Sequence, residues 1–223
     1  MVPNFEEVLQ FFEKEEKSYN YFCGRISSLL IDNPDLEKNG MQLVHSVKQR
    51  KKSRSSIISK CERKFKNGKL VSPENAAQEL EDFFGIRLLH IHFDQVEHIN
   101  SFLHQKANSG DFFFGEKPIA YTWDPEHENK LKGLGFEVKF KDSYYTSLHY
   151  ILRVSQESPI RCELQVRTLF EEAWGELDHW MNYPYPTEIL ALKEQLLVLS
   201  RVVTAGSRLA VSINRIYENS LHT

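Results

Sequence analysis

The sequence predicts an α/β (α+β) protein in which helices flank a mixed, mostly antiparallel sheet of about five strands. Apolar residues recur at helical spacing over long segments at both ends of the chain. Helical and β-rich segments interleave between them, and the last β-rich segments follow one another through short turns, as in a mixed sheet. We expect one domain over 1–223, with its core at about 40–185 and helical additions at 4–31 and 187–219.

Local patterns place the elements in order. The first helix should end before the turn IDNPD, and Ser72 followed by Pro73 is a helix-start signal. Periodicity predicts helices at 4–31, around 39–48, at 54–66, at 73–83, around 95–106, at 169–183 and at 187–219. Alternation predicts strands at 85–93, 136–141, 147–154 and 161–168. Residues 107–132 are loop-rich and predict no element, and Gly206 is a candidate interruption of the last helix.

Composition indicates a globular protein of the cytoplasm. Hydrophobic residues make up 41% of the chain and aromatic residues 12%, enough for a sizeable core. The sequence has no run of 18 or more apolar residues and no signal-peptide pattern, so we expect no membrane span. Three widely spaced cysteines, Cys23, Cys61 and Cys162, predict reduced thiols without a disulfide framework or a zinc site.

Positive charge gathers in one segment of a chain whose net charge is −3. Residues 47–70 hold ten of the 28 basic residues and one of the 31 acidic residues. A solvated helix face, a nucleic-acid or targeting patch and a polyphosphate pocket all fit such a local field. Helical spacing over 54–66 separates an apolar stripe from a polar one. The apolar stripe is Ile57, Ile58, Cys61 and Phe65, and the polar stripe is Ser56, Lys60, Arg63 and Lys64.

Two carboxylates are candidates for a metal site. In the predicted strand RCELQVRT, a period of two puts Glu163, Gln165 and Arg167 on one face and apolar residues on the other. Asp82 stands near a predicted helix end, just before the strand that carries Arg87. Mg²⁺ prefers oxygen ligands and takes one or two carboxylates together with phosphate oxygens. The alternative readings are a helix-end residue for Asp82 and a surface acid for Glu163.

Four motifs follow one another between residues 50 and 183. The pattern R-x-K-x-x-x-S-x-x-x-K-x-x-R-K is matched by Arg50, Lys52, Ser56, Lys60, Arg63 and Lys64. The pattern D-x-x-G-I-R is matched by Asp82, Gly85, Ile86 and Arg87. G-Y-R-S-L-H is matched in part by Tyr145, Ser147, Leu148 and His149, and E-x-Q-x-R-T by Glu163, Gln165, Arg167 and Thr168. In this order the motifs resemble the synthetase domain of RelA/SpoT-type alarmone synthetases, in a small, single-domain form.

The resemblance implies a nucleotidyltransferase-like synthetase fold and an ATP-dependent pyrophosphokinase. Such an enzyme moves the β,γ-pyrophosphate of ATP to the ribose 3′-hydroxyl of GDP or GTP, and gives (p)ppGpp and AMP. Asp82 and Glu163 would be catalytic and would hold Mg²⁺, with Glu163 also helping to deprotonate the 3′-hydroxyl.

The same resemblance assigns residues to the two nucleotides. ATP would be bound by Arg50 and Arg87, which hold the adenine, and through its phosphates by Lys52, Ser56, Lys60 and Arg63. The acceptor would be bound by Tyr145, which stacks on its base, and by His149, Gln165 and Arg167.

Departures from the family pattern leave the acceptor open. Tyr144 and Thr146 replace the Gly and Arg of G-Y-R-S-L-H. One alternative is a toxin of the same family that pyrophosphorylates the tRNA 3′-CCA end or makes (p)ppApp, neutralised by an antitoxin. Basic residues beyond the ATP set favour it, namely Lys48, Lys51, Arg54, Lys66 and Lys69. A further alternative is a catalytically degenerate nucleotide- or RNA-binding module.

Two expectations concern the rest of the chain. The sequence contains no His-Asp dipeptide, so we expect no HD hydrolase domain. The leucine-rich helix at 187–219 would cover the sheet or form the interface of a homo-oligomer.

Overall fold

The structure is a computed structural model that describes residues 5–183 and 185–221. Residues 1–4, 184 and 222–223 lie outside the described part, and with them the first residue of the predicted helix at 4–31.

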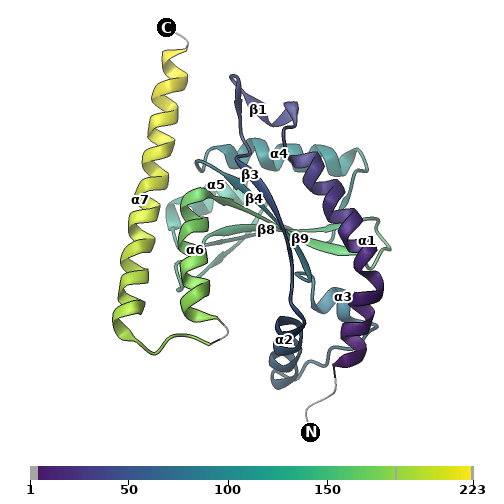
Figure 1. The fold of residues 1–223 in the computed structure, drawn as a ribbon. Helices are drawn as coiled ribbons and strands as arrows, with labels where there is room; N and C mark the ends of the chain where they lie inside the picture. Colours follow the sequence, from purple (N-terminus) through teal and green to yellow (C-terminus); the bar gives the residue numbers. More distant parts are fainter. Residues whose placement is uncertain (1–4, 184, 222–223) are drawn as a thin grey trace.

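A mixed sheet forms the centre of the molecule (Figure 1). Within the described residues it has seven strands in the order β3-β4-β9-β8-β6-β7, and the short β5 pairs with β8. The strands are β3 (Ser46–Lys51), β4 (Phe84–His90), β5 (Phe113–Phe114), β6 (Ile119–Thr122), β7 (Glu137–Phe140), β8 (Ser147–Arg153) and β9 (Arg161–Thr168). The β4–β9 and β6–β7 pairs are parallel and the other pairs are antiparallel, which confirms the predicted mixed, mostly antiparallel sheet. Two further short strands, β1 (Glu37–Lys38) and β2 (Met41–Gln42), form a separate hairpin.

Helices cover both faces of this sheet. They are α1 (Glu6–Leu30), α2 (Arg54–Lys66), α3 (Ala76–Glu79), α4 (Gln95–Asn108), α5 (Glu128–Gly133), α6 (Leu169–Asn182) and α7 (Leu190–Ser220), with 3-10 turns η1 (Pro34–Leu36) and η2 (Pro125–His127). Figure 1 shows α1 on one side of the sheet, and α6 with α7 on the other. The side chains of α1 and α4 bury against the sheet in one continuous apolar core.

Strand alternation separates the core from the polar face. On β4 and β9, Ile86, Leu88, Leu164 and Val166 are buried in the core below α1. Phe12 and Tyr19 of α1 stack on the phenylalanines that lead into β4, with ring centroids 3.9 Å (Phe12–Phe83) and 5.4 Å (Tyr19–Phe84) apart. Each such burial is worth about 1.5–3 kcal/mol. The residues between these positions emerge on the opposite face, toward α6.

One predicted helix is wrong and another is shorter than predicted. In place of the predicted helix around 39–48 the chain forms the short strand β2 and, from Ser46, the edge strand β3, whose ladder partner is β4. An edge strand with a largely solvated outer surface carries few apolar residues, so its period of two is masked. The predicted helix at 73–83 shortens to α3, because Asn75 closes a turn by accepting a hydrogen bond from the Ser72 amide and donating one to the Leu70 carbonyl.

The loop-rich segment and the sheet size also differ from expectation. Residues 107–132 contain β5, β6, η2 and α5, which the sequence did not predict. With β3, the short strands bring the sheet to seven strands instead of about five. The predicted helices at 4–31, 54–66, around 95–106, at 169–183 and at 187–219 are confirmed within a few residues.

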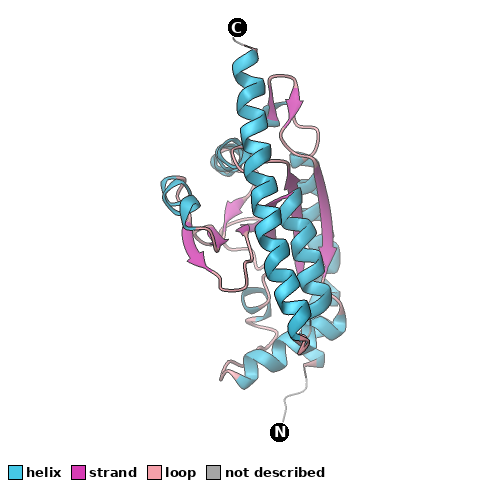
Figure 2. Ribbon diagram, turned by 90° about the vertical axis from the view of Figure 1, so that its left-hand side faces the viewer, coloured by secondary structure: helices cyan, strands magenta, loops and turns pink. Residues whose placement is uncertain are grey.

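The last helix, α7, packs on α6 and leaves an apolar stripe exposed. Trp174 Nε1 of α6 donates to the Leu196 carbonyl at 2.9 Å. Gly206 does not interrupt the helix but lets it approach Phe170, whose ring lies 2.7 Å from where a Cβ would stand. Leu209, Ile213 and Ile216 are more than half exposed. Figure 2 shows α7 running along the molecule beside α6. By length and mean hydropathy alone this helix could span a membrane.

Candidate active site

The polar face of β8 and β9 carries the centre of the candidate site. In the antiparallel register His149 lies opposite Gln165, and Ile151 lies opposite Glu163. The period of two places Glu163, Gln165 and Arg167 on one face, as the sequence predicts. His149 and Ser147 of the neighbouring strand share that face, so the two strands present a continuous polar surface toward α6 and α2.

Five side chains on this face close a ring of hydrogen bonds, which we call the β8–β9 ring: Glu163, His149, Tyr145, Arg167 and Gln165. Glu163 Oε1 lies 2.7 Å from His149 Nδ1, and His149 Nε2 lies 3.0 Å from the Tyr145 hydroxyl. Arg167 Nη2 donates to that hydroxyl and to Gln165 Oε1, the latter at 2.9 Å. Gln165 Nε2 donates to Glu163 Oε2 at 2.6 Å and closes the ring.

The ring keeps Glu163 ionised although its side chain is only 17% exposed. Burial raises the pKa of a carboxyl group, and the negative charge of Asp82 acts in the same direction. The charge of the His149 imidazole, the hydrogen bond to it and the hydrogen bond from Gln165 outweigh these effects and lower the pKa of Glu163 below its ordinary value. Glu163 is therefore a carboxylate at neutral pH, available to a cation or to a proton.

Asp82 forms the second anionic centre, held between two lysines. It lies just before β4, where Lys52 Nζ reaches Oδ2 at 2.5 Å and Lys60 Nζ reaches Oδ1 at 2.6 Å. Burial raises the pKa of Asp82, but the charges of Lys60 and Lys52 dominate and lower it to about 2. Lys52 directly follows β3 and Lys60 belongs to α2, so the basic segment supplies both partners of the carboxylate.

The two predicted adenine-binding arginines stand together at the other end of the site. Arg50 of β3 and Arg87 of β4 line one cavity of about 290 Å³. Arg87 Nη1 donates to Glu172 of α6 at 2.8 Å and also to Glu176 one turn later. Arg50 is exposed. The face of a guanidinium held at its edge by carboxylates stays free for stacking on an aromatic ring.

Two members of the predicted ATP set lie further from this centre. Ser56 is in the first turn of α2, where the Ser53 hydroxyl donates to its Oγ at 2.9 Å. Arg63 is exposed near the end of α2, and no hydrogen bond or ion pair joins its guanidinium to another described residue. The structure thus brings Lys52 and Lys60 to Asp82, while Arg63 remains on the surface of the same helix.

Three of the five additional basic residues are neutralised by nearby acids. Lys51 pairs with Glu16 at 2.6 Å, and Arg54 pairs with Glu6 and Glu13, all from α1. Lys69 pairs with Glu79 at 2.9 Å. The remaining two, Lys48 and Lys66, are exposed. Most of the excess charge therefore ties α2 and its flanks to neighbouring elements.

Two cavities meet the β8–β9 ring from different sides. One of about 480 Å³ is lined by Lys60, Asp82, His149 and Glu163. The other, of about 290 Å³, is lined by Arg50, Arg87, Tyr145, Gln165 and Arg167. Because the ring joins His149 and Glu163 to the other three by hydrogen bonds, the two cavities share one wall. All predicted site residues except Lys52, Ser56 and Arg63 line one or the other.

Sequence reasoning missed several side chains that complete the site. Glu172 and Glu176 hold Arg87. Tyr121 of β6 packs edge-on against His149, with ring centroids 4.9 Å apart. The i, i+4 spacing of Glu172 and Glu176 was a readable signal, since it puts both carboxylates on one face of a helix.

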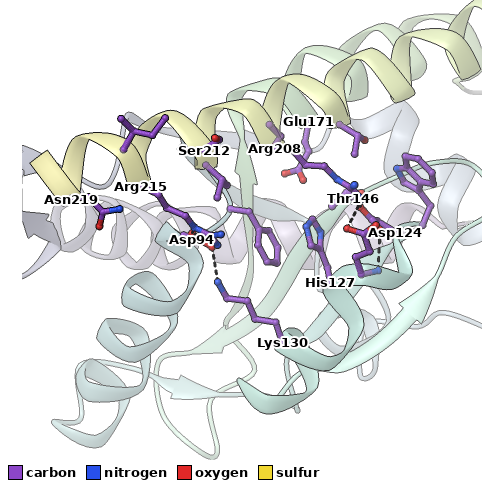
Figure 3. Close-up of a pocket in the computed structure, with 17 residues that line it drawn as sticks. Asp94, Asp124, His127, Lys130, Thr146, Glu171, Arg208, Ser212, Arg215 and Asn219 are labelled. Carbon is purple, nitrogen blue, oxygen red and sulfur yellow. Dashed lines mark hydrogen bonds and ion pairs between the residues drawn. The ribbon is translucent and has the colours of Figure 1, made fainter.

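The loop that departs from the family pattern has an unusual backbone. Tyr144 stands where the pattern has Gly, and it adopts φ +60°, with its ring against Trp123. Thr146 lines a third cavity of about 490 Å³, bounded by α7, η2 and α5. Figure 3 shows that Arg208 and Arg215 of α7 reach into this cavity toward Asp124 and Asp94. Tyr145 lines a wall of the site, whereas Thr146 lines a separate space.

The fold and the candidate site, in which two carboxylates and several basic side chains lie on the polar face of a mixed sheet, are typical of nucleotide-dependent transferases. Residues 49–188 match the family model described as the region found in RelA / SpoT proteins, and the chain belongs to that family. It is an enzyme of the GTP pyrophosphokinase type. One relative, GTP pyrophosphokinase YjbM of Bacillus subtilis (strain 168), is 25% identical over 174 residues, covering 78% of this chain and 72% of its own length.

Solved structures share the fold at low sequence identity. Small alarmone synthetase 1 from Bacillus subtilis matches with a TM-score of 0.66 and 21% identity, over 95% of this chain and 98% of its own. A GTP pyrophosphokinase family protein from Streptococcus pneumoniae matches with a TM-score of 0.68 and 19% identity, over 94% and 95%. Small alarmone synthetase 1 has also been solved with its product pppGpp, and that structure matches with a TM-score of 0.62 and 20% identity, over 92% and 98%.

Proposed function

We propose that this protein transfers the β,γ-pyrophosphate of ATP to the ribose 3′-hydroxyl of GDP or GTP, which gives (p)ppGpp and AMP. The observation that carries the proposal is the pair of carboxylates, Asp82 and Glu163, in one cavity beside Lys60 and next to two arginines. A reaction on polyphosphates depends mainly on charge neutralisation and in-line positioning, and this arrangement serves both.

The donor nucleotide would occupy the side of β3, β4 and α2. Arg50 and Arg87 would hold the adenine between their guanidinium planes, a role that suits Arg better than Lys. Lys52, Lys60, Ser56 and Arg63 would bind the phosphates. Lys52 and Lys60 are paired with Asp82, so bound phosphates would replace that carboxylate as the partner of the lysines.

Asp82 and Glu163 fit a Mg²⁺ site. They line one cavity, both are ionised, and Mg²⁺ accepts one or two carboxylates with phosphate oxygens completing its shell. Mg²⁺ bound there would neutralise charge on the transferred pyrophosphate.

The acceptor would lie against the β8–β9 ring, with Tyr145 stacked on its base and His149, Gln165 and Arg167 beside its phosphates. The 3′-oxygen would attack the β-phosphorus of ATP, the bond from that phosphorus to the α,β-bridging oxygen would break, and AMP would leave. Glu163 would take the hydroxyl proton. His149 and Gln165 hold both of its oxygens in place for this step.

The surface charges support a mononucleotide acceptor over tRNA. Lys51, Arg54 and Lys69 are already paired with carboxylates, which leaves Lys48 and Lys66 of the additional basic set for a long phosphate backbone. We propose a cytoplasmic protein that does not insert into membranes, whose exposed α7 stripe contacts a second copy of the chain. We assign no antitoxin.

An acceptor series tests this proposal. Purified protein with Mg²⁺ and ATP labelled at the β- or γ-phosphate is incubated separately with GDP, GTP, AMP, ADP and deacylated tRNA. We expect labelled guanosine products together with stoichiometric AMP. Labelling of tRNA or of adenosine nucleotides alone would replace the acceptor assignment with the toxin alternative, and labelling of none would favour a degenerate binding module.

A further inference from the structure

One carboxylate, Glu172, joins the two halves of the site. Its Oε1 accepts from Arg87 Nη1 at 2.8 Å, and its Oε2 accepts from Arg167 Nη1 at 3.3 Å. Arg87 belongs to β4 on the donor side, and Arg167 belongs to the β8–β9 ring on the acceptor side. The Glu172 side chain is 9% exposed, and the Arg167 side chain is 5% exposed. Few water molecules can therefore screen or replace these contacts.

The start of α6 fixes where Glu172 stands. Thr168 ends β9 and caps the helix: its side chain accepts from the Glu171 amide, and the Glu171 carboxylate accepts from the Thr168 amide. This capping box makes the turn from strand to helix rigid. Glu172 follows directly in the first turn, close above the strand that carries Arg167. Glu176, one turn later, contacts Arg87 but makes no ion pair with Arg167 among the described contacts.

Both oxygens of Glu172 are committed to arginines. A carboxylate between two guanidinium groups lowers their mutual repulsion and limits the rotamers of both. Arg87 is held along one edge, which leaves its plane free for adenine. Arg167 is held at Nη1, while its Nε and Nη2 bind Ser147, Tyr145 and Gln165. When the guanidinium of one arginine moves, Glu172 moves with it, and its hydrogen bond to the other arginine changes.

We propose that Glu172 is a positioning residue that couples donor binding at Arg87 to acceptor binding at the β8–β9 ring; this rests on the proposed function for the identity of the two nucleotides. ATP that stacks on Arg87 restricts the guanidinium that Glu172 contacts, and through this bridge it also restricts Arg167, Tyr145 and Gln165. By linkage the acceptor must then strengthen ATP binding by the same factor.

The test compares Glu172→Gln with Glu176→Gln, which removes a carboxylate from Arg87 alone. Calorimetry measures the dissociation constant of the non-hydrolysable analogue AMPCPP without and with saturating GDP, and that of GDP without and with AMPCPP. Wild type should bind each nucleotide more tightly in the presence of the other. In Glu172→Gln we expect both single affinities to fall by about tenfold, and the mutual enhancement to disappear. In Glu176→Gln only AMPCPP affinity should fall, with the enhancement retained.

Steady-state rates separate positioning from a general structural effect. Glu172→Gln should raise the KM of both substrates. A loosened fold would instead lower the thermal midpoint and the amount of active protein, and would leave both KM values unchanged. The inference is overturned if Glu172→Gln and Glu176→Gln change the affinities for AMPCPP and GDP and their mutual enhancement in the same way. It is also overturned if Glu172→Gln retains the wild-type enhancement. Wild type that binds both nucleotides with enhancement but transfers nothing would contradict the proposed function alone.

Discussion

At the scale of single residues, Asp82 and Glu163 are two carboxylates kept ionised by different partners. Asp82 is held by the direct charges of Lys52 and Lys60, and Glu163 by His149 and Gln165 within the β8–β9 ring. The pairing of Asp82 with Lys52 and Lys60 holds in position the two cations that are expected to bind phosphate. The ring meanwhile holds Glu163 in one rotamer, so that both carboxylates face the same cavity.

The Asp82 ion pairs predict a specific pH dependence. The pKa of Asp82 is about 2 in the folded protein and near 3.9 when unfolded, so its ionised form stabilises the fold by about 2 kcal/mol above pH 4. This stabilisation should be lost as the pH falls from about 4 to about 2. We expect Lys60→Met to raise the pKa of Asp82, as followed by carboxyl-carbon NMR. An Asp82 that titrates near 4 in wild type would contradict the ion pairs.

At the scale of elements, the α6–α7 pair frames the open face of the sheet. α6 starts directly from β9 through the Thr168 capping box, so the strand that carries Glu163, Gln165 and Arg167 also sets the first turn that carries Glu172. α7 reaches α6 through Trp174 and through the close contact of Gly206 with Phe170. The sheet and α6 therefore form the site together, and α7 supports α6 from outside.

Two helical glycines provide a matched test of that contact. At Gly24 in α1 a Cβ would meet nothing within 4 Å, so Gly24→Ala should raise the free energy of unfolding by about 0.5–1 kcal/mol through helix propensity. At Gly206 the same methyl would lie 2.7 Å from the Phe170 ring, so Gly206→Ala should gain nothing or lose stability. Urea denaturation measures both. An equal gain at the two sites would refute the close packing of α7 on α6.

At the scale of the whole molecule, most of the basic residues in 47–70 form ion pairs with acidic residues of the same chain. The acids of α1 pair with Lys51 and Arg54, and Glu79 pairs with Lys64 and Lys69. Lys52 and Lys60 pair with Asp82 at the site. One basic segment thus serves two ends: it docks α2 against its neighbours and lines the cavity of the site.

The parts of the fold and of the candidate site that depend on a local sequence pattern could be predicted. The alternation in RCELQVRT placed Glu163, Gln165 and Arg167 on one face, and helical spacing placed Lys60 beside the apolar stripe of α2. The edge strand β3 could not be predicted, because its pairing partner lies more than 30 residues away and its outward side chains are polar. Glu172 was missed for a related reason: Arg167 is near it in the sequence, but Arg87 lies 85 residues away, and only the pairing of β4 with β9 brings both arginines to α6.

The backbone conformation at Tyr144 is a further feature that the local sequence pattern could not predict. Its φ of +60° follows from tertiary packing against Trp123, and nothing in the neighbouring sequence announces it. The family pattern marks the position by its usual Gly, and the structure gives the physical reason: a left-handed backbone that Gly adopts at no steric cost.

The central claim, that Asp82 and Glu163 form a carboxylate pair for pyrophosphate transfer, is tested most directly by single-turnover transfer. Wild type, Asp82→Asn and Glu163→Gln are mixed with labelled ATP, Mg²⁺ and GDP, and the formation of AMP and of the pyrophosphorylated nucleotide is followed, with circular dichroism to establish folding. We predict a loss of at least 10²-fold in rate in each folded variant, because each removes a charge that acts at the reacting phosphates. Wild-type rates in either folded variant would contradict the claim.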